Sequence, residues 1–125
     1  MQAPVPHAFH IPTNYQTALQ HFIEFYPHIE MYVSNAMRAD AISAAHLQIA
    51  TRALQQHLIA ALELGDIRRV GPSLRWLEGL LVNYGVPTSL LTRFLEIYQH
   101  AIQTHIPAID QTIFSDYLIE FRRER

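Results

Sequence analysis

Hydrophobic residues between Gly65 and Pro87 form the most regular pattern in the chain. They recur at alternating steps of three and four residues, at Ile67, Val70, Leu74, Leu77, Leu81 and Tyr84. On a helix these side chains fall within an arc of about 100°, the narrow apolar stripe of a helix that packs against another helix. Gly65-Asp66 and Gly85 bound the stripe and are typical of helix ends. The pattern predicts a helix around which the other segments pack.

The segment before Gly65 contains similar patterns. Thr13 and Gln16 have the spacing of a helix capping box. The apolar stripe that follows them runs up to Pro27, which predicts the end of a first helix. A shorter helical segment comes next, with its stripe at Ile29, Val33, Ala36 and Met37.

Residues 28–64 form either one kinked helix or two, with Asp40 as the candidate N-cap of the second. The apolar face of this region is centred on Leu47, Ala50, Leu54, Leu58, Ala61 and Leu62, and it is widened by Ile42, Ile49 and Leu64. A face that covers more than half of the helix surface predicts a central helix with several neighbours.

The pair Gly71-Pro72 interrupts the stripe of the organising helix. Either residues 66–70 form a separate turn or the helix is kinked, and the unbroken stripe favours the kink. After Gly85 a short connection predicts an antiparallel helix, with its stripe at Leu91, Phe94, Tyr98, Ala101 and His105. A last helix follows Pro107, with its stripe at Ile109, Ile113, Tyr117 and Phe121.

These patterns together predict an all-α fold, a single-domain helical bundle of five or six helices around a four-helix core. The length of 125 residues fits one such core. We assign residues 13–125 to the helical-bundle domain. Residues 1–12 hold three prolines and no period, and we expect them to form an extended N-terminal arm.

Composition excludes several classes of protein. The chain has no cysteine, which excludes disulfides, thiolate metal sites and cysteine nucleophiles, and its nine basic residues are all arginine. A formal net charge of −2 argues against a nucleic-acid partner. No apolar run approaches the ~20 residues of a membrane span, and the N-terminus does not resemble a signal peptide. We therefore expect a cytoplasmic protein with no membrane partner.

Candidate chemistry is confined to the eight histidines, because no catalytic motif and no repeated Glu-x-x-His pair is present. We accordingly expect no enzyme and no metal centre. His46 and His57 lie on one side of a helix but about 16 Å apart, too far to share a metal ion. His57 or His105 could serve as an axial ligand to haem or another tetrapyrrole. For His46 and His57 the simpler explanation is that they are packed in the core, and for His105 it is a helix-end histidine stabilised by the helix dipole.

Apolar side chains that lie away from the main stripe of their helix, on a second face, are the remaining clue to function. Trp76 lies about 100° or more from the stripe of its own helix, and Val82 lies off it on the other side. Phe114 and Leu118 lie off the stripe of the last helix. Such faces predict a helix covered on two sides or a contact with another chain, and we expect a homodimer.

Three short stretches resemble known families: Ala60–Asp66 (AALELGD), Trp76–Leu81 (WLEGLL) and Gly85–Pro87 (GVP). They are similar to the helical bundle of cobalamin-dependent regulators and to the globin-like N-terminal sensor modules of stress-response co-antagonists. The resemblance implies a regulatory or sensory bundle that works through a partner. The corrinoid-binding fold, its Asp-x-His-x-x-Gly loop and the Glu-His pair of the light-sensing regulators are absent, so no cobalt ligand can be transferred to this chain.

The sequence therefore favours a non-enzymatic regulatory or protein-interaction helical module with a protein partner. The alternative is a sensory bundle that binds a tetrapyrrole or a corrinoid such as cobalamin. In that alternative the cofactor-binding residues are His57, His105 and Trp76.

Overall fold

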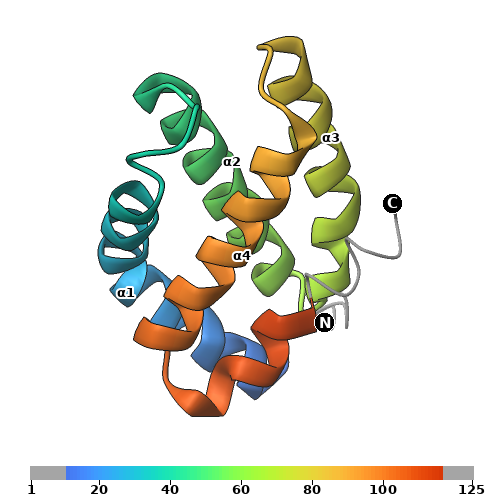
Figure 1. Cartoon of the computed structure of the whole chain (residues 1–125). Helices are drawn as coiled ribbons and strands as arrows, with labels where there is room; N and C mark the ends of the chain where they lie inside the picture. The colour runs from blue at the N-terminus through green and yellow to red at the C-terminus, as the bar shows by residue number, and fades with distance from the viewer. Residues whose placement is uncertain (1–10, 117–125) are drawn as a thin grey trace.

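The computed structural model describes residues 11–116 as an all-α bundle (Figure 1). The helices are α1 (Thr13–Ala36), α2 (Ala44–Glu63), α3 (Val70–Asn83) and α4 (Thr88–His105), with short 3-10 helices η2 (Ile67–Arg69) and η3 (Ala108–Asp110). Residues 111–116 continue as a further helical segment, and the described residues contain no strand. The predicted fold class is confirmed. Most of the predicted arm, and the last stripe positions Tyr117 and Phe121, lie outside the described residues.

The four α-helices surround one core in chain order. α1 packs on α2, α2 on α3 and α3 on α4, and α4 packs back on α1. The largest side chains in the centre are Tyr98, Phe22, Phe94 and Phe114, each less than 2% exposed. The predicted stripes of α3 and α4 are buried over most of their length. Their last members are not, since Tyr84 is 47% exposed and His105 is half-buried.

α1 does not end at Pro27, as predicted, but runs through it to Ala36. A proline inside a helix costs about 3 kcal/mol. Ile29 and Val33, beyond the proline, are both completely buried, and each contributes about 1.5–3 kcal/mol by burial. Continuing the helix offsets the local cost because it keeps these side chains on the buried face.

The predicted N-cap residues of the first two helices, Thr13 and Asp40, are both wrong. Pro12, rather than Thr13, is the N-cap of α1, and the Gln16 amide donates to the carbonyl of Ile11 at 2.7 Å. The N-cap of α2 is Ser43, whose hydroxyl accepts from the backbone N–H of His46 at 3.1 Å. Residues 28–64 thus belong to two helices that are separated by residues 37–43.

Asp40, the predicted cap, has a different role. Its Oδ1 accepts from Nε of Arg93 on α4 at 2.7 Å, so it ties the connection after α1 to another helix. Ser43, the residue directly before Ala44, occupies the capping position of α2 instead.

The predicted turn at Gly65 is confirmed by a φ of +71°, a backbone conformation that favours glycine. A Cβ at this position would also lie 2.9 Å from Cδ of Pro12. Asp66 then caps η2 rather than the organising helix itself. Residues 67–69 form a separate turn, as one of the two predicted alternatives has it, but α3 begins at Val70 directly after this turn rather than at Pro72. Pro72 is the third residue of α3, where the backbone N–H has no partner inside the helix.

Candidate functional site

Two pairs of rings lie along the outer side of the contact between α2 and α3. The rings of His46 and Tyr84 are stacked, with centroids 4.6 Å apart and an angle of 21° between planes. The rings of His57 and Trp76 meet edge to face at 5.9 Å and 67°. The pairs occur in opposite order along the two helices because α2 and α3 are antiparallel. We call these four residues the α2–α3 face.

The α2–α3 face is open to solvent. Trp76 is 56% and Tyr84 47% exposed, while both histidines are half-buried. The exposed position predicted for Trp76 is confirmed. The expectation of histidines packed in the core is wrong for His46 and His57, because both lie on the outer flank of α2 and use their rings to support an exposed aromatic side chain.

The structure brings together two of the three predicted cofactor-binding residues. His57 and Trp76 are in ring contact, but His105 lies at the contact between α4 and α1. There its ring stacks on His28 at 5.6 Å and meets the edge of Tyr32 at 6.0 Å. A single cofactor on the α2–α3 face would therefore use His57 without His105.

At Phe114 the structure supports the first of the two predicted alternatives, a helix that is covered on two sides. Phe114 is completely buried, with its ring centroid 5.6 Å from that of Phe22. Ile109, predicted to face the core, is 81% exposed, and the buried stripe begins at Ile113. The segment after Pro107 first forms η3, so its phase differs from that of one continuous helix. Leu118 lies outside the described residues.

A buried acid was not predicted from the sequence. Asp110 on η3 has a side chain only 3% exposed, and its Oδ2 lies 2.6 Å from Nδ1 of His21 on α1, which is 26% exposed. The two residues are 89 positions apart, and no spacing rule connects them. The pair joins α1 to η3 and provides a partner for the buried carboxylate, as a buried polar group requires.

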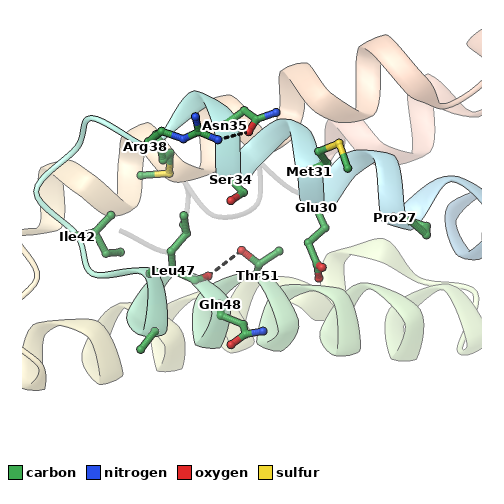
Figure 2. Close-up of a pocket in the computed structure, with 13 residues that line it drawn as sticks. Pro27, Glu30, Met31, Ser34, Asn35, Arg38, Ile42, Leu47, Gln48 and Thr51 are labelled. Carbon is green, nitrogen blue, oxygen red and sulfur yellow. Dashed lines mark hydrogen bonds between the residues drawn. The ribbon is translucent and has the colours of Figure 1, made fainter.

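A groove of about 950 Å³ lies between the C-terminal half of α1 and the N-terminal half of α2 (Figure 2). Its lining includes Glu30, Met31 and Ser34 from α1, Arg38 and Ile42 from the connection after α1, and Leu47 from α2. We call it the α1–α2 groove. Helical periodicity in the sequence does not predict this groove, because the groove depends on how far apart α1 and α2 lie near their connection.

Tyr26 holds the Glu30 side chain of this groove in place. Its hydroxyl donates to Oε2 of Glu30 at 3.0 Å. Burial raises the pKa of Tyr26 well above its ordinary value, and the hydrogen bond and charge of Glu30 raise it further. The hydroxyl therefore keeps its proton at all physiological pH values and remains a donor to Glu30.

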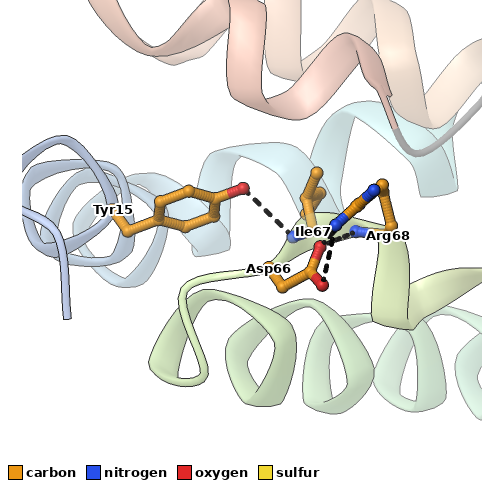
Figure 3. A network of polar contacts seen from close by, with 4 residues as sticks. All are labelled: Tyr15, Asp66, Ile67 and Arg68. Atoms are coloured by element: carbon orange, nitrogen blue, oxygen red, sulfur yellow. Dashed lines mark hydrogen bonds and ion pairs between the residues drawn. The ribbon is translucent and has the colours of Figure 1, made fainter. Parts of the chain in front are cut away.

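A polar network closes the junction between α2 and α3 (Figure 3). The Asp66 carboxylate accepts from the backbone N–H and from Nε of Arg68, both at 3.1 Å. The hydroxyl of Tyr15 on α1 accepts from the backbone N–H of Ile67 at 3.2 Å. Through these bonds the start of α1 is anchored to η2.

The Asp66 network predicts a pH dependence of stability. Hydrogen bonds from the Arg68 side chain, with its backbone N–H and the nearby positive charges, hold the pKa of Asp66 below its ordinary value of about 3.9. The resulting stabilisation is present at pH values above the pKa of Asp66 in the unfolded chain. It is lost as the pH falls through the pKa of Asp66 in the folded protein. We expect Asp66→Asn to lower the free energy of unfolding at neutral pH but not at the acid end of a urea-denaturation series.

Arg68→Ala is the matched variant, because it removes the donor instead of the acceptor. It should weaken the same loss of stability that we expect at acid pH. If wild type and both variants lose stability in parallel between pH 5 and pH 2 (a range set by the Asp pKa of about 3.9), the network does not titrate as described.

Comparison with known proteins adds no family: the chain matches no protein-family model, no curated protein and no solved structure. Among the described residues, no group of three or more His, Cys, Asp or Glu side chains could hold a metal ion. No helix within residues 11–116 has both the length and the apolar character needed to cross a membrane.

Proposed function

We propose that the chain is a non-enzymatic regulatory module that binds a protein partner on the α2–α3 face. The observation that supports the proposal is Trp76, which is 56% exposed in the middle of α3 and rests edge-on against His57. Large aromatic side chains that are rigid and exposed are typical of the anchor residues of protein interfaces. A side chain of this size would contribute strongly to affinity once a partner removed it from water.

The chemistry of the face indicates the kind of partner. Its four side chains are two aromatic rings and two imidazoles, so it presents flat apolar surface with a few hydrogen-bonding groups and no permanent charge. The two ring pairs are separated by eleven residues on α2, about 16 Å. A partner helix of about three turns would contact both pairs, with apolar side chains on Trp76 and Tyr84.

Trp76→Ala tests this proposal by removing the anchor. The tagged wild-type protein, Trp76→Ala and Val82→Ala would each be incubated with extract from the source cells, and bound proteins would be quantified by mass spectrometry. Val82 is 50% exposed on the opposite flank of α3, which makes it a matched control. We expect a partner that is lost with Trp76→Ala and retained with Val82→Ala.

A purified candidate can then be measured directly. Trp76 is the only tryptophan in the chain, so its fluorescence reports on this face alone. Binding should shift the emission to shorter wavelength as water is excluded. A partner that binds without changing the Trp76 emission would contradict the proposed surface.

The alternative function is a sensory bundle with a tetrapyrrole or corrinoid on the same face. The contact of 5.9 Å between His57 and Trp76 favours it, because an imidazole ligand beside a flat aromatic ring suits a planar cofactor. We expect haemin or cobalamin, if bound, to add a visible absorbance band and to quench Trp76. His57→Ala should abolish both effects, whereas His105→Ala, on the other side of the bundle, should abolish neither.

A further inference from the structure

One glycine of α3 is not required by the fold. Gly79 lies inside α3 and, unlike Gly65 and Gly85, it has no positive φ. A Cβ at this position would meet nothing within 4 Å among the described residues, so no neighbour needs the close approach that glycine allows. Glycine inside a helix is less favourable than alanine because it loses more conformational freedom on folding. Gly79 therefore lowers the stability of α3 without a benefit inside the chain.

Gly79 belongs to an uncharged stripe on the outward side of α3. Four exposed residues of this helix follow one another at steps of four, three and four: Pro72, Trp76, Gly79 and Asn83. On a helix they lie within an arc of about 60°, and we call them the outer stripe of α3. The two charged residues of α3, Arg75 and Glu78, lie outside this arc. The outer face of a surface helix usually carries charged side chains, so the outer stripe is atypical of a face that meets only water.

The outer stripe borders the α2–α3 face at Trp76. The ring of Trp76 rests against His57 on the side of α2, and Gly79 lies on the other side of Trp76, about one turn further along α3. Anchor residues of protein interfaces lie near the centre of the contact, surrounded by residues that exclude water. A partner that covered the α2–α3 face alone would leave Trp76 at the edge of the contact, open to water on the side of Gly79.

We infer that the partner packs a helix across the outer stripe of α3 and inserts an uncharged apolar side chain into the open space over Gly79, beside Trp76. The inference rests on the proposed function, because it describes the partner of the same surface. Steps of three and four residues are the spacing at which two helices interlock, with a side chain of one helix in a hole between four residues of the other. A glycine deepens that hole. Because the outer stripe carries no charge, it suits an apolar side chain such as leucine or methionine.

The stability of two variants tests the first step of this inference on the chain alone. Gly79→Ala should lower the equilibrium constant of unfolding about two- to fivefold, because alanine favours the helix and its Cβ enters open space. Gly79→Leu should be at least as stable as wild type for the same reasons. Urea denaturation followed by far-UV circular dichroism measures both. A loss of stability in Gly79→Ala would show that the fold itself requires the glycine, and it would overturn the inference.

Binding tests the second step. The probe is the purified protein that the wild-type chain captures and Trp76→Ala loses. Titration calorimetry with the full chain should give a Kd about tenfold higher, or more, for Gly79→Leu, since the added side chain fills the space that the partner enters. Ser34→Leu is the matched control, because it adds the same side chain at an exposed position of α1. It should leave the Kd unchanged.

The possible outcomes separate this inference from the proposed function. A partner that is lost with Trp76→Ala but binds Gly79→Leu as tightly as wild type overturns the inference and leaves the proposed function in place. A partner that is retained with Trp76→Ala, or the capture of no partner at all, contradicts the proposed function and the inference with it. Self-association of the wild type that Gly79→Leu abolishes would also overturn the inference, since a second copy of the chain would then cover the outer stripe.

Discussion

Phe22→Ala will lower the free energy of unfolding by about 3–5 kcal/mol, the usual cost of removing a buried aromatic ring. Phe22 is completely buried on α1, with its ring centroid 5.8 Å from that of Tyr26 and 5.6 Å from that of Phe114. Truncation would leave a cavity where α1 meets the segment after η3. Urea denaturation followed by far-UV circular dichroism measures the loss.

Ile23→Ala is the control for this experiment, since it removes a large apolar side chain from the next position of the same helix. Ile23 is 55% exposed, so we expect a loss of no more than about 0.5 kcal/mol. Equal losses for Phe22→Ala and Ile23→Ala would mean that α1 does not present the described face to the core.

His21→Ala has the second-largest expected effect, a loss of about 2–3 kcal/mol. The substitution removes the partner, at 2.6 Å, of the Asp110 carboxylate, whose side chain is only 3% exposed. A buried carboxylate without a donor loses hydration and gains nothing in return. The free energy of unfolding at neutral pH is again the quantity to measure.

His21→Gln separates the hydrogen bond from the packing of the ring. A glutamine amide can still donate toward Asp110, so this variant should retain a substantial part of the stability that alanine loses. If His21→Ala costs no more than His28→Ala, which removes an exposed histidine about two turns further along α1, the pair with Asp110 does not stabilise the fold.

The fold was largely predictable because helical periodicity reports which side chains are buried. In α4, for example, the stripe of Leu91, Phe94 and Tyr98 is buried as predicted. The boundary at Pro27 was not predictable by the same reasoning. A proline penalty is local, whereas the burial of Ile29 and Val33 that offsets it depends on α2 and α4 being in place.

The candidate site was predictable only in part. Helix geometry placed Trp76 and His105 on particular faces, but it did not show which faces meet. The order of the helices around the core decides that His57 contacts Trp76 and that His105 contacts His28 instead. The pair of His21 and Asp110 is a contact between the two ends of the chain, for which the sequence carries no local signal.

The closure of the helix ring has a consequence for synthesis of the protein. α1, α2 and α3 each pack on the next helix in the chain, but Phe22 and His21 are covered by Phe114 and Asp110, close to the end of the described residues. During translation α1 leaves the ribosome before Asp110 and Phe114 are made, so the part of its apolar face that contains Phe22 stays uncovered until they have emerged. The nascent α1 therefore exposes a binding site for chaperones until that later segment has folded onto it.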